Sequence, residues 1–232
     1  MRGSTLFLIF VILCAGAAAA IWRGWITLPA EWDPWAPLDI KAETNFLTPY
    51  KLSRLKGNAQ LCDQVLSSSK VRFSRQADSP ASANCPLTDV LRVQGSDVAL
   101  SSSFLSSCPL AVAYAMFEIH TLQPAAEQVF GQRVVRIDHL GSFACRNVYG
   151  RSSGRLSQHA SANALDIAGF RLADGQRINL LRDWKDEGDK GRFLRQVRDG
   201  ACKNFNTVLG PDYNAAHRNH FHLDMGLWRV CR

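Results

Sequence analysis

The distribution of apolar and charged positions divides the chain into three parts. Residues 4–22 are largely apolar and carry no charge, residues 25–47 are rich in Trp and Pro, and the remainder mixes apolar and charged positions. In this last part, short apolar stretches are separated by Gly, Pro, Ser and Asp, as is typical of a globular domain. We therefore expect an N-terminal segment at 1–24, a linker at 25–47 and one domain at 48–232.

The uncharged run is long enough to cross a bilayer, and Arg2 and Arg23 flank it. Its small residues at 15–20 would also suit cleavage by a signal peptidase. The run is long for the core of a signal peptide, and Trp22 and Trp25 are typical of a membrane interface. We therefore favour an uncleaved anchor over a cleaved signal. With either one, the rest of the chain is expected outside the cytoplasm.

The linker contains several X-Pro steps, which favour extended chain. We expect it to lie along the membrane surface or to hold the domain away from it. Packing of its tryptophans on the domain is the alternative.

Within the domain, periodicity predicts a mixture of helices and short strands. We expect helices at 51–57, 61–67, 108–120 and 189–205, and short helical turns at 85–91 and 124–131. We expect strands at 93–100 and 133–139, a hairpin with strands at 164–172 and 177–180, a last strand through the C-terminal histidines, and irregular chain at 67–82 and 150–157. Helices on one side of a small antiparallel sheet make α+β the predicted fold class.

One of the seven cysteines, Cys14, lies in the apolar run, and six lie in the expected domain. An even number of cysteines in an exported domain indicates disulfides. The six allow 15 pairings, and our working hypothesis pairs neighbours. The expected bridges are Cys62–Cys85, Cys108–Cys145 and Cys202–Cys231. A zinc site made of cysteines is disfavoured because no Cys-x2-Cys pair exists.

The formal net charge is +7. The basic residues are scattered, without a Lys/Arg run interleaved with aromatics, which argues against nucleic acid as a partner. An anionic envelope polymer or membrane surface fits this charge better. The charge could equally serve solubility alone.

Two short stretches, 157–166 and 217–224, hold four of the six histidines and two carboxylates. Asp166 lies on the first strand of the expected hairpin, and His159 lies on the loop that enters it. Imidazole and carboxylate are the ligands of a catalytic zinc that keeps one coordination position open.

The second stretch alternates polar and apolar residues, so a strand would place His220, His222 and Asp224 on one face. The two stretches together predict a metal site. His120 and His139 lack such spacing, and we expect them to be structural.

The pattern Ser-x-His-x6-Asp followed by His-x-His resembles zinc peptidases that cut D-alanine-containing cell-wall peptides. These are the D-alanyl-D-alanine carboxypeptidases and dipeptidases and the penicillin-insensitive murein endopeptidase. From about Thr48 to the C-terminus, the chain more closely resembles the extensin-like C-terminal domain proteins of bacterial envelopes. The second likeness rests on Cys145-Arg146 and on the blocks 156–160, 201–205, 208–211 and 220–224.

The peptidase resemblance implies a Zn²⁺ ion with three ligands, His159, Asp166 and His222. It implies catalytic roles for His220, His217 and Arg146. His217 matches the additional histidine of the murein endopeptidase pattern, and Arg146 matches an arginine that faces the substrate in these peptidases.

Two positions depart from the peptidase pattern. Ala162 stands where Gly is usual, and Asn219 stands where the carboxypeptidases have a catalytic Glu. Either a histidine replaces that Glu, or the domain binds metal without cutting anything. The signalling domain of Hedgehog proteins, which has the same zinc fold and acts mainly through partners, makes the second option a real one.

If the site is catalytic, zinc lowers the pKa of its bound water to about 7 for attack on an amide. His220 is expected to stabilise the oxyanion or to carry the proton, with His217 as the second candidate. Ser157 is expected to orient the His159 loop rather than to attack substrate, and Asp224 to accept a histidine N–H.

The first hypothesis is therefore a zinc peptidase of peptidoglycan, facing the periplasm and anchored in the inner membrane. The second is a zinc-binding module that binds cell wall or a protein partner without catalysis. A structural wall protein is a third reading, but the chain has no Ser-Pro repeats.

Overall fold

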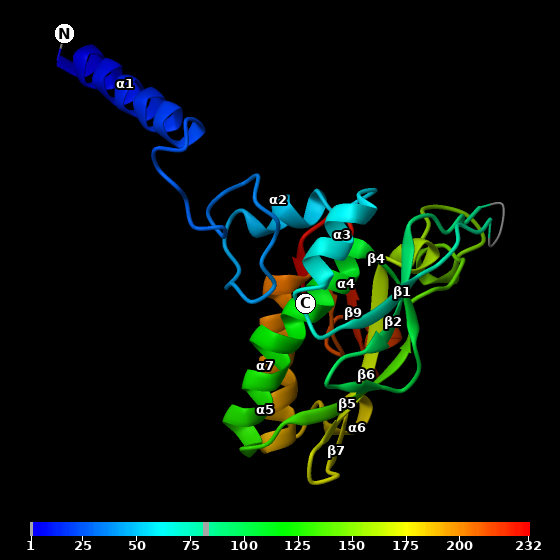
Figure 1. The fold of residues 1–232 in the computed structure, drawn as a ribbon. Coiled ribbons are helices and arrows are strands. Elements are labelled where there is room, and N and C mark those ends of the chain that lie inside the picture. The colour runs from blue at the N-terminus through cyan, green and yellow to red at the C-terminus, as the bar shows by residue number, and fades with distance from the viewer. Residues whose placement is uncertain (1, 81–83) are drawn as a thin grey trace.

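In the computed structural model, which describes residues 2–80 and 84–232, helices cover one face of a mixed β-sheet (Figure 1). The strand order is β10-β8-β9-β6-β5-β3, with β7 also paired to β6. The strands are β3 (Ala99–Leu100), β5 (Val134–Gly141), β6 (Ala164–Leu172), β7 (Arg177–Asn179), β8 (Thr207–Leu209), β9 (Phe221–Asp224) and β10 (Val230–Cys231).

These elements confirm the α+β class and the β6–β7 hairpin. The sheet is larger than expected and is not wholly antiparallel, because β3 pairs with β5 and β10 with β8 in parallel. These two edge strands have two residues each, which is too short for a periodic pattern in the sequence.

A second, three-stranded sheet precedes, in the sequence, the helix that begins at Cys108. Its strands are β1 (Arg72–Arg75), β2 (Val90–Gly95) and β4 (Phe104–Ser107). It corrects three expectations: the 67–82 loop contains β1, the 85–91 segment is not helical, and the 93–100 strand is divided between the two sheets. Gly95, with φ 124°, turns the chain between those two strands. Residues 81 and 82 of the expected loop lie outside the described part of the chain.

One long helical stretch replaces the two separate helices expected at 108–131. It consists of α4 (Cys108–Phe117), the π-helical turn η1 (Glu118–Leu122) and α5 (Gln123–Phe130). Pro124 lacks an N–H, and its ring would clash with the carbonyl four residues earlier in an α-helix. The π turn avoids this clash, with the Gln123 N–H bonded to the Glu118 carbonyl. Gly131 ends α5 in the left-handed conformation (φ 61°), as expected.

Apart from the N-terminal helix, the remaining helices are short, except for the expected helix near the C-terminus. They are α2 (Thr48–Ser53), α3 (Ala59–Leu66), α6 (Leu180–Asp183), α7 (Asp189–Asn204) and the 3₁₀ turns η2 (Val148–Gly150), η3 (Gln158–Ser161) and η4 (Ala215–His217). Helices α4, α5 and α7 pack together beside the main sheet (Figure 1). Phe170 of β6 meets Phe193 of α7 edge-on, with ring centroids 5.4 Å apart, so the main core lies between these layers.

Strand alternation decides which side chains face that core. Leu165 and Ile167 of β6 and Phe221 and Leu223 of β9 are buried in it. Because successive strand residues point to opposite faces, the side chains between them face away from the helices. The candidate metal ligands on β6 and β9 therefore lie on the sheet face opposite the helical layer.

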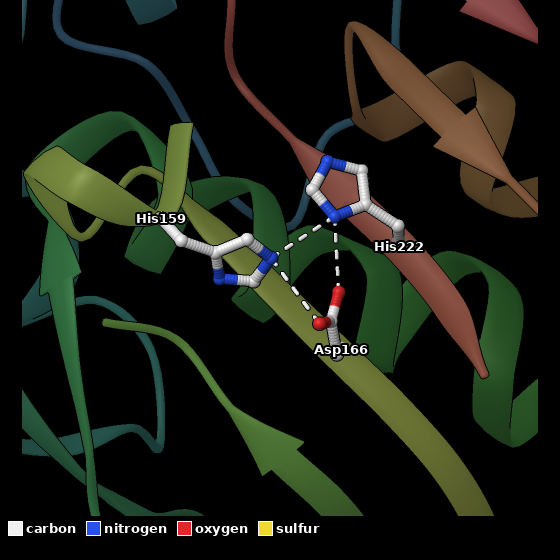
Figure 2. Close-up of side chains that lie close together, drawn as sticks. All are labelled: His159, Asp166 and His222. Atoms are coloured by element: carbon white, nitrogen blue, oxygen red, sulfur yellow. Dashed lines mark hydrogen bonds and ion pairs between the residues drawn. The ribbon is translucent and has the colours of Figure 1, made fainter. Parts of the chain in front are cut away.

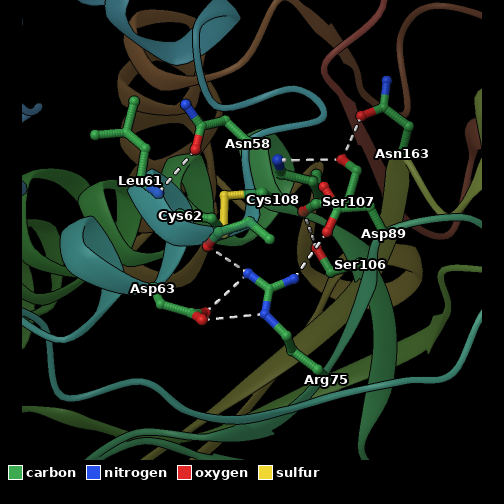
Figure 3. The surroundings of a disulfide bond; sticks show 12 residues. Asn58, Leu61, Cys62, Asp63, Arg75, Asp89, Ser106, Ser107, Cys108 and Asn163 are labelled. Carbon is green, nitrogen blue, oxygen red and sulfur yellow. Dashed lines mark hydrogen bonds and ion pairs between the residues drawn. A yellow bond between two sulfur atoms is a disulfide. The ribbon is translucent and has the colours of Figure 1, made fainter.

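Three disulfides connect the domain, and two of them differ from the expected pairs. The bridges are Cys62–Cys108, Cys85–Cys145 and Cys202–Cys231. Only the last was expected. Helix α3 packs on α4, which brings Cys62 to the start of α4 (Figure 3). Pairing thus follows distance in the fold rather than order in the sequence. Disulfides of this kind suggest an extracytoplasmic location.

The N-terminal helix α1 (Arg2–Trp22) lies apart from the domain (Figure 1). Its 20 residues from Gly3 to Trp22 are long and apolar enough to cross a membrane, as an anchor or as a signal sequence. The segment after it is not free of the domain. Ile40 is fully buried, and its carbonyl accepts a hydrogen bond from His120 Nε2 (2.8 Å), while Trp25 and Trp35 remain exposed. Aliphatic residues rather than tryptophans therefore dock this segment, and His120 is structural.

Candidate metal centre

The pairing of β6 with β9 brings the two sequence stretches together. In this antiparallel pair, Asp166 lies directly opposite His222, and Ala164 lies opposite Asp224. Directly opposed residues have Cβ atoms about 4.5–5.5 Å apart on the same face of the sheet. The register of two strands that are far apart in sequence thus places a carboxylate beside an imidazole.

His159 reaches the same place from η3, the turn before β6. The Ser157 hydroxyl caps this turn by accepting a hydrogen bond from the His159 backbone N–H (3.3 Å). His159 Nε2 then lies 3.2 Å from Asp166 Oδ2 and 3.1 Å from His222 Nδ1, and His222 Nδ1 lies 3.0 Å from Asp166 Oδ1 (Figure 2). We call His159, Asp166 and His222 the three-donor cluster.

Two outer contacts determine which nitrogen of each histidine faces the cluster. His159 Nδ1 lies 3.1 Å from the Ser142 carbonyl, and His222 Nε2 lies 2.9 Å from Asp224 Oδ2. Both oxygens can only accept, so these nitrogens carry the protons. In the neutral rings, His159 Nε2 and His222 Nδ1 then present lone pairs to Asp166. Carbonyl and carboxylate partners of this kind commonly orient metal-binding histidines.

The cluster could hold a metal ion, since all three donor atoms lie within 4.8 Å of one another. Zinc bonds of about 2.0–2.1 Å in tetrahedral geometry separate ligand atoms by about 3.3 Å, close to the 3.0–3.2 Å between these atoms. Two imidazole lone pairs and a carboxylate facing one another also require a cation between them. The donor set therefore fits a divalent metal in both spacing and charge.

Without a metal, a proton can neutralise the same cluster. Burial lowers the pKa of His222, but hydrogen bonds to Asp166 and Asp224 outweigh it and raise that pKa to about 9. Burial raises the pKa of Asp166, but hydrogen bonds from His159 and His222 outweigh it and hold the pKa well below its usual range. The site thus favours one positive charge at its centre.

Two more histidines lie beside the cluster. His220, just before β9, has Nε2 3.6 Å from Asp166 Oδ1, and its Nδ1 lies 2.9 Å from the Asn219 side-chain oxygen. His217, at the end of η4, packs against His220 with ring centroids 5.3 Å apart. Burial, and then the positive charge of His222, lower the pKa of His217 to about 4. His217 is therefore neutral at pH 7.

The three-donor cluster opens into a cleft with a volume of about 600 Å³. Arg146, Ser157, His217 and His220 line it, so the structure brings every expected site residue together there. The lining also includes large side chains that the sequence did not single out, among them Tyr149, Arg155, Tyr213 and Trp228. Asn214 and the Ser142 carbonyl were also missed. A backbone oxygen leaves no signal in the sequence, and Asn214 has only a weak one as the capping residue before η4.

Ala162, in the position where Gly is usual, ends η3 in the left-handed conformation (φ 52°). Its methyl group is fully buried against Leu87 and Val90. Ala162→Gly would relieve about 1–2 kcal/mol of strain. It would also remove a buried methyl worth about 0.8 kcal/mol and increase the entropy of the unfolded chain by a similar amount.

We therefore expect Ala162→Gly to change the free energy of unfolding by less than about 1 kcal/mol. Ala162→Val should reduce it by more than about 2 kcal/mol, because a β-branched residue is strained at positive φ and overfills the site. Chemical denaturation of the full chain in detergent measures both. A large gain from the glycine variant would mean that the buried methyl contributes nothing.

The fold and the cleft together define an α+β domain with three disulfides and a possible His/Asp metal cluster. Residues 60–232 match the family model described as extensin-like protein C-terminus, and the chain belongs to this family. No curated protein and no solved structure matches the chain.

Proposed function

We propose that the protein is a zinc-dependent peptidase that hydrolyses amide bonds of peptidoglycan peptides in the bacterial cell envelope. The observation that carries the proposal is the convergence of His159 Nε2, Asp166 and His222 Nδ1 at metal-ligand spacing in a cleft. The domain would face the periplasm, with α1 as its anchor in the inner membrane. The likeness of the two histidine motifs to cell-wall peptidases names the substrate class.

Zinc held by the cluster would supply a Lewis acid for the amide carbonyl and would lower the pKa of a bound water to about 7. The cleft supplies the remaining groups. Arg146 can donate to a substrate carboxylate or to the developing oxyanion. His220, close to Asp166, can stabilise the same oxyanion, and His217 or His220 can move the proton to the leaving amine.

A second candidate function is a zinc-binding module that attaches to cell wall or a protein partner without cutting it. One observation favours it: Asn219 stands where related peptidases have a catalytic Glu, and its side chain contacts His220 instead. An amide cannot accept a proton as a carboxylate does. This candidate therefore predicts zinc without hydrolysis.

To separate the two candidates, the full chain would be purified in detergent under oxidising conditions, assayed for bound zinc and incubated with peptidoglycan. We expect one zinc per chain and newly released muropeptides by mass spectrometry. His217→Ala and His220→Ala should both keep zinc. Loss of the histidine that moves the proton should slow hydrolysis by about 10²–10⁴-fold.

His120→Gln, which alters a histidine far from the cleft, is the matched control and should keep both properties. Zinc with intact peptidoglycan would favour the binding module. Absence of zinc from the wild-type chain would refute both candidates.

A further inference from the structure

Asn214 caps the turn that carries His217, and its side chain has a defined orientation. Its Oδ1 accepts a hydrogen bond from the Ala216 backbone N–H (3.0 Å) and lies 2.8 Å from His217 Nδ1. A backbone N–H can only donate, so the side-chain atom that faces it must be the oxygen. This hydrogen bond therefore identifies which atom of the Asn214 amide is the oxygen and which is the nitrogen.

The other end of the same amide agrees with this orientation. Asn214 Nδ2 donates to the phenolic oxygen of Tyr149 (3.2 Å), which comes from η2, a separate segment lining the cleft. Tyr149 has φ 58°, a left-handed conformation that costs about 1–2 kcal/mol for a residue with a Cβ. Strain of this kind persists where the surroundings hold a residue in place, often at functional sites. The bridge from Tyr149 to Asn214 ties two segments of the cleft together.

This orientation determines the tautomer of His217. Because Asn214 Oδ1 cannot donate, His217 Nδ1 must carry the proton, and a neutral ring then has its lone pair on Nε2. His217 is only 8% exposed, and its ring is held between those of Tyr213 (5.4 Å) and His220 (5.3 Å). The ring thus has little freedom to turn over.

His217 differs from the histidines of the three-donor cluster in the contacts of its second ring nitrogen. In His159 and His222, the nitrogen that faces inward contacts Asp166, and His220 Nε2 lies 3.6 Å from the same carboxylate. Within the described residues, His217 Nε2 makes no hydrogen bond, although the residue lines the cleft. Its lone pair is therefore available to an incoming proton.

We propose that Asn214 is the positioning residue that makes His217, rather than His220, the proton acceptor for amide hydrolysis; this inference rests on the proposed function. In this step, water forms the new C–O bond and loses one proton to His217 Nε2. The same proton then passes to the leaving nitrogen as the C–N bond breaks. The second proton of the water stays on the new carboxyl group and is then lost to solvent, so the products are a carboxylate and an amine and the ring returns to its neutral form.

The test reads the tautomer directly. The full chain would be labelled with ¹⁵N in histidine, kept in detergent with zinc, and His217 assigned by comparison with His217→Ala. We expect long-range ¹H–¹⁵N couplings to report the Nδ1–H tautomer in the wild type and in Asn214→Asp, which retains an acceptor oxygen. Asn214→Ala should show the Nε2–H form or a mixture. Asn45, which does not line the cleft, likewise accepts a hydrogen bond from the backbone N–H two residues on (Leu47, 2.8 Å), so Asn45→Ala is the matched control and should leave the tautomer unchanged.

Kinetics on peptidoglycan fragments provide the second reading. Asn214→Ala should lower kcat by about 10–100-fold with little change in KM, because orientation is lost while the binding surface remains. Asn214→Asp should recover much of that loss. A role confined to folding would instead leave both kcat and the tautomer unchanged in whatever fraction of the variant is folded.

The outcomes separate the two proposals. An Nε2–H tautomer in the wild type, or an unchanged tautomer in Asn214→Ala, would overturn the role of Asn214 even in an active peptidase. The expected tautomers without any hydrolysis by the wild type would refute the proposed function, and the proton-acceptor role with it.

Discussion

Replacement of His222 by alanine is expected to abolish stoichiometric zinc binding and all zinc-dependent hydrolysis. His222 contributes one of the three donor atoms, and its removal would also leave Asp166 Oδ1 without its imidazole partner. The remaining His159 and Asp166 offer only two protein donors, fewer than catalytic zinc sites contain. Metal analysis of the dialysed full chain and mass spectrometry of peptidoglycan digests measure the two losses.

Asp224→Asn provides a graded comparison within the same site. It keeps an acceptor for His222 Nε2 but removes the negative charge 2.9 Å away, and loss of such an outer partner typically costs about 10–100-fold in metal affinity. We expect Asp224→Asn to bind zinc more weakly than wild type but more tightly than His222→Ala. Equal zinc binding by His222→Ala and wild type would remove the cluster from consideration as the metal site.

Removal of the Cys62–Cys108 bridge is expected to lower the free energy of unfolding by about 4 kcal/mol. The bridge closes a loop with a sequence separation of 46, and chain-entropy models assign about this stabilisation to a loop of that length. Both cysteines are buried where α3 meets α4, so Cys62→Ala/Cys108→Ala also leaves a small void in the core. Urea denaturation of the full chain in detergent, followed by circular dichroism, measures the change.

Cys14→Ser is the matched control for this experiment. Cys14 is exposed and unpaired, and its replacement should change the unfolding free energy by less than about 0.5 kcal/mol. Peptide mapping under non-reducing conditions tests the connectivity itself. Recovery of a Cys62–Cys85 peptide instead of Cys62–Cys108 would contradict the structure, as would a double variant as stable as the wild type.

Asn219, which departs from the peptidase pattern, has a defined contact in the structure. From the sequence, it is the absence of a catalytic carboxylate. In the fold, its side chain contacts His220, while Asn214 contacts His217 in the same way. Each histidine beside the cluster thus has an asparagine partner. We regard this pair of contacts as the main reason to test a histidine, and not a carboxylate, as the group that moves the proton.

The sequence by itself determined the features that arise from neighbouring residues. The apolar run of α1, the β6–β7 hairpin, helix α7 and the left-handed end of α5 at Gly131 all follow from local periodicity and turn chemistry. The two histidine stretches were also visible, because the candidate residues lie close together within each stretch. The likeness of short blocks to a known family was sufficient to indicate the family.

Only the tertiary structure decided the features that join distant segments. The β6–β9 register that places Asp166 opposite His222 is one, and the pairing of Cys62 with Cys108 and Cys85 with Cys145 is another. The Ser142 carbonyl behind His159 and the bridge from Tyr149 to Asn214 are further examples. Local preferences cannot specify these contacts, because each depends on how whole helices and strands pack around a shared core.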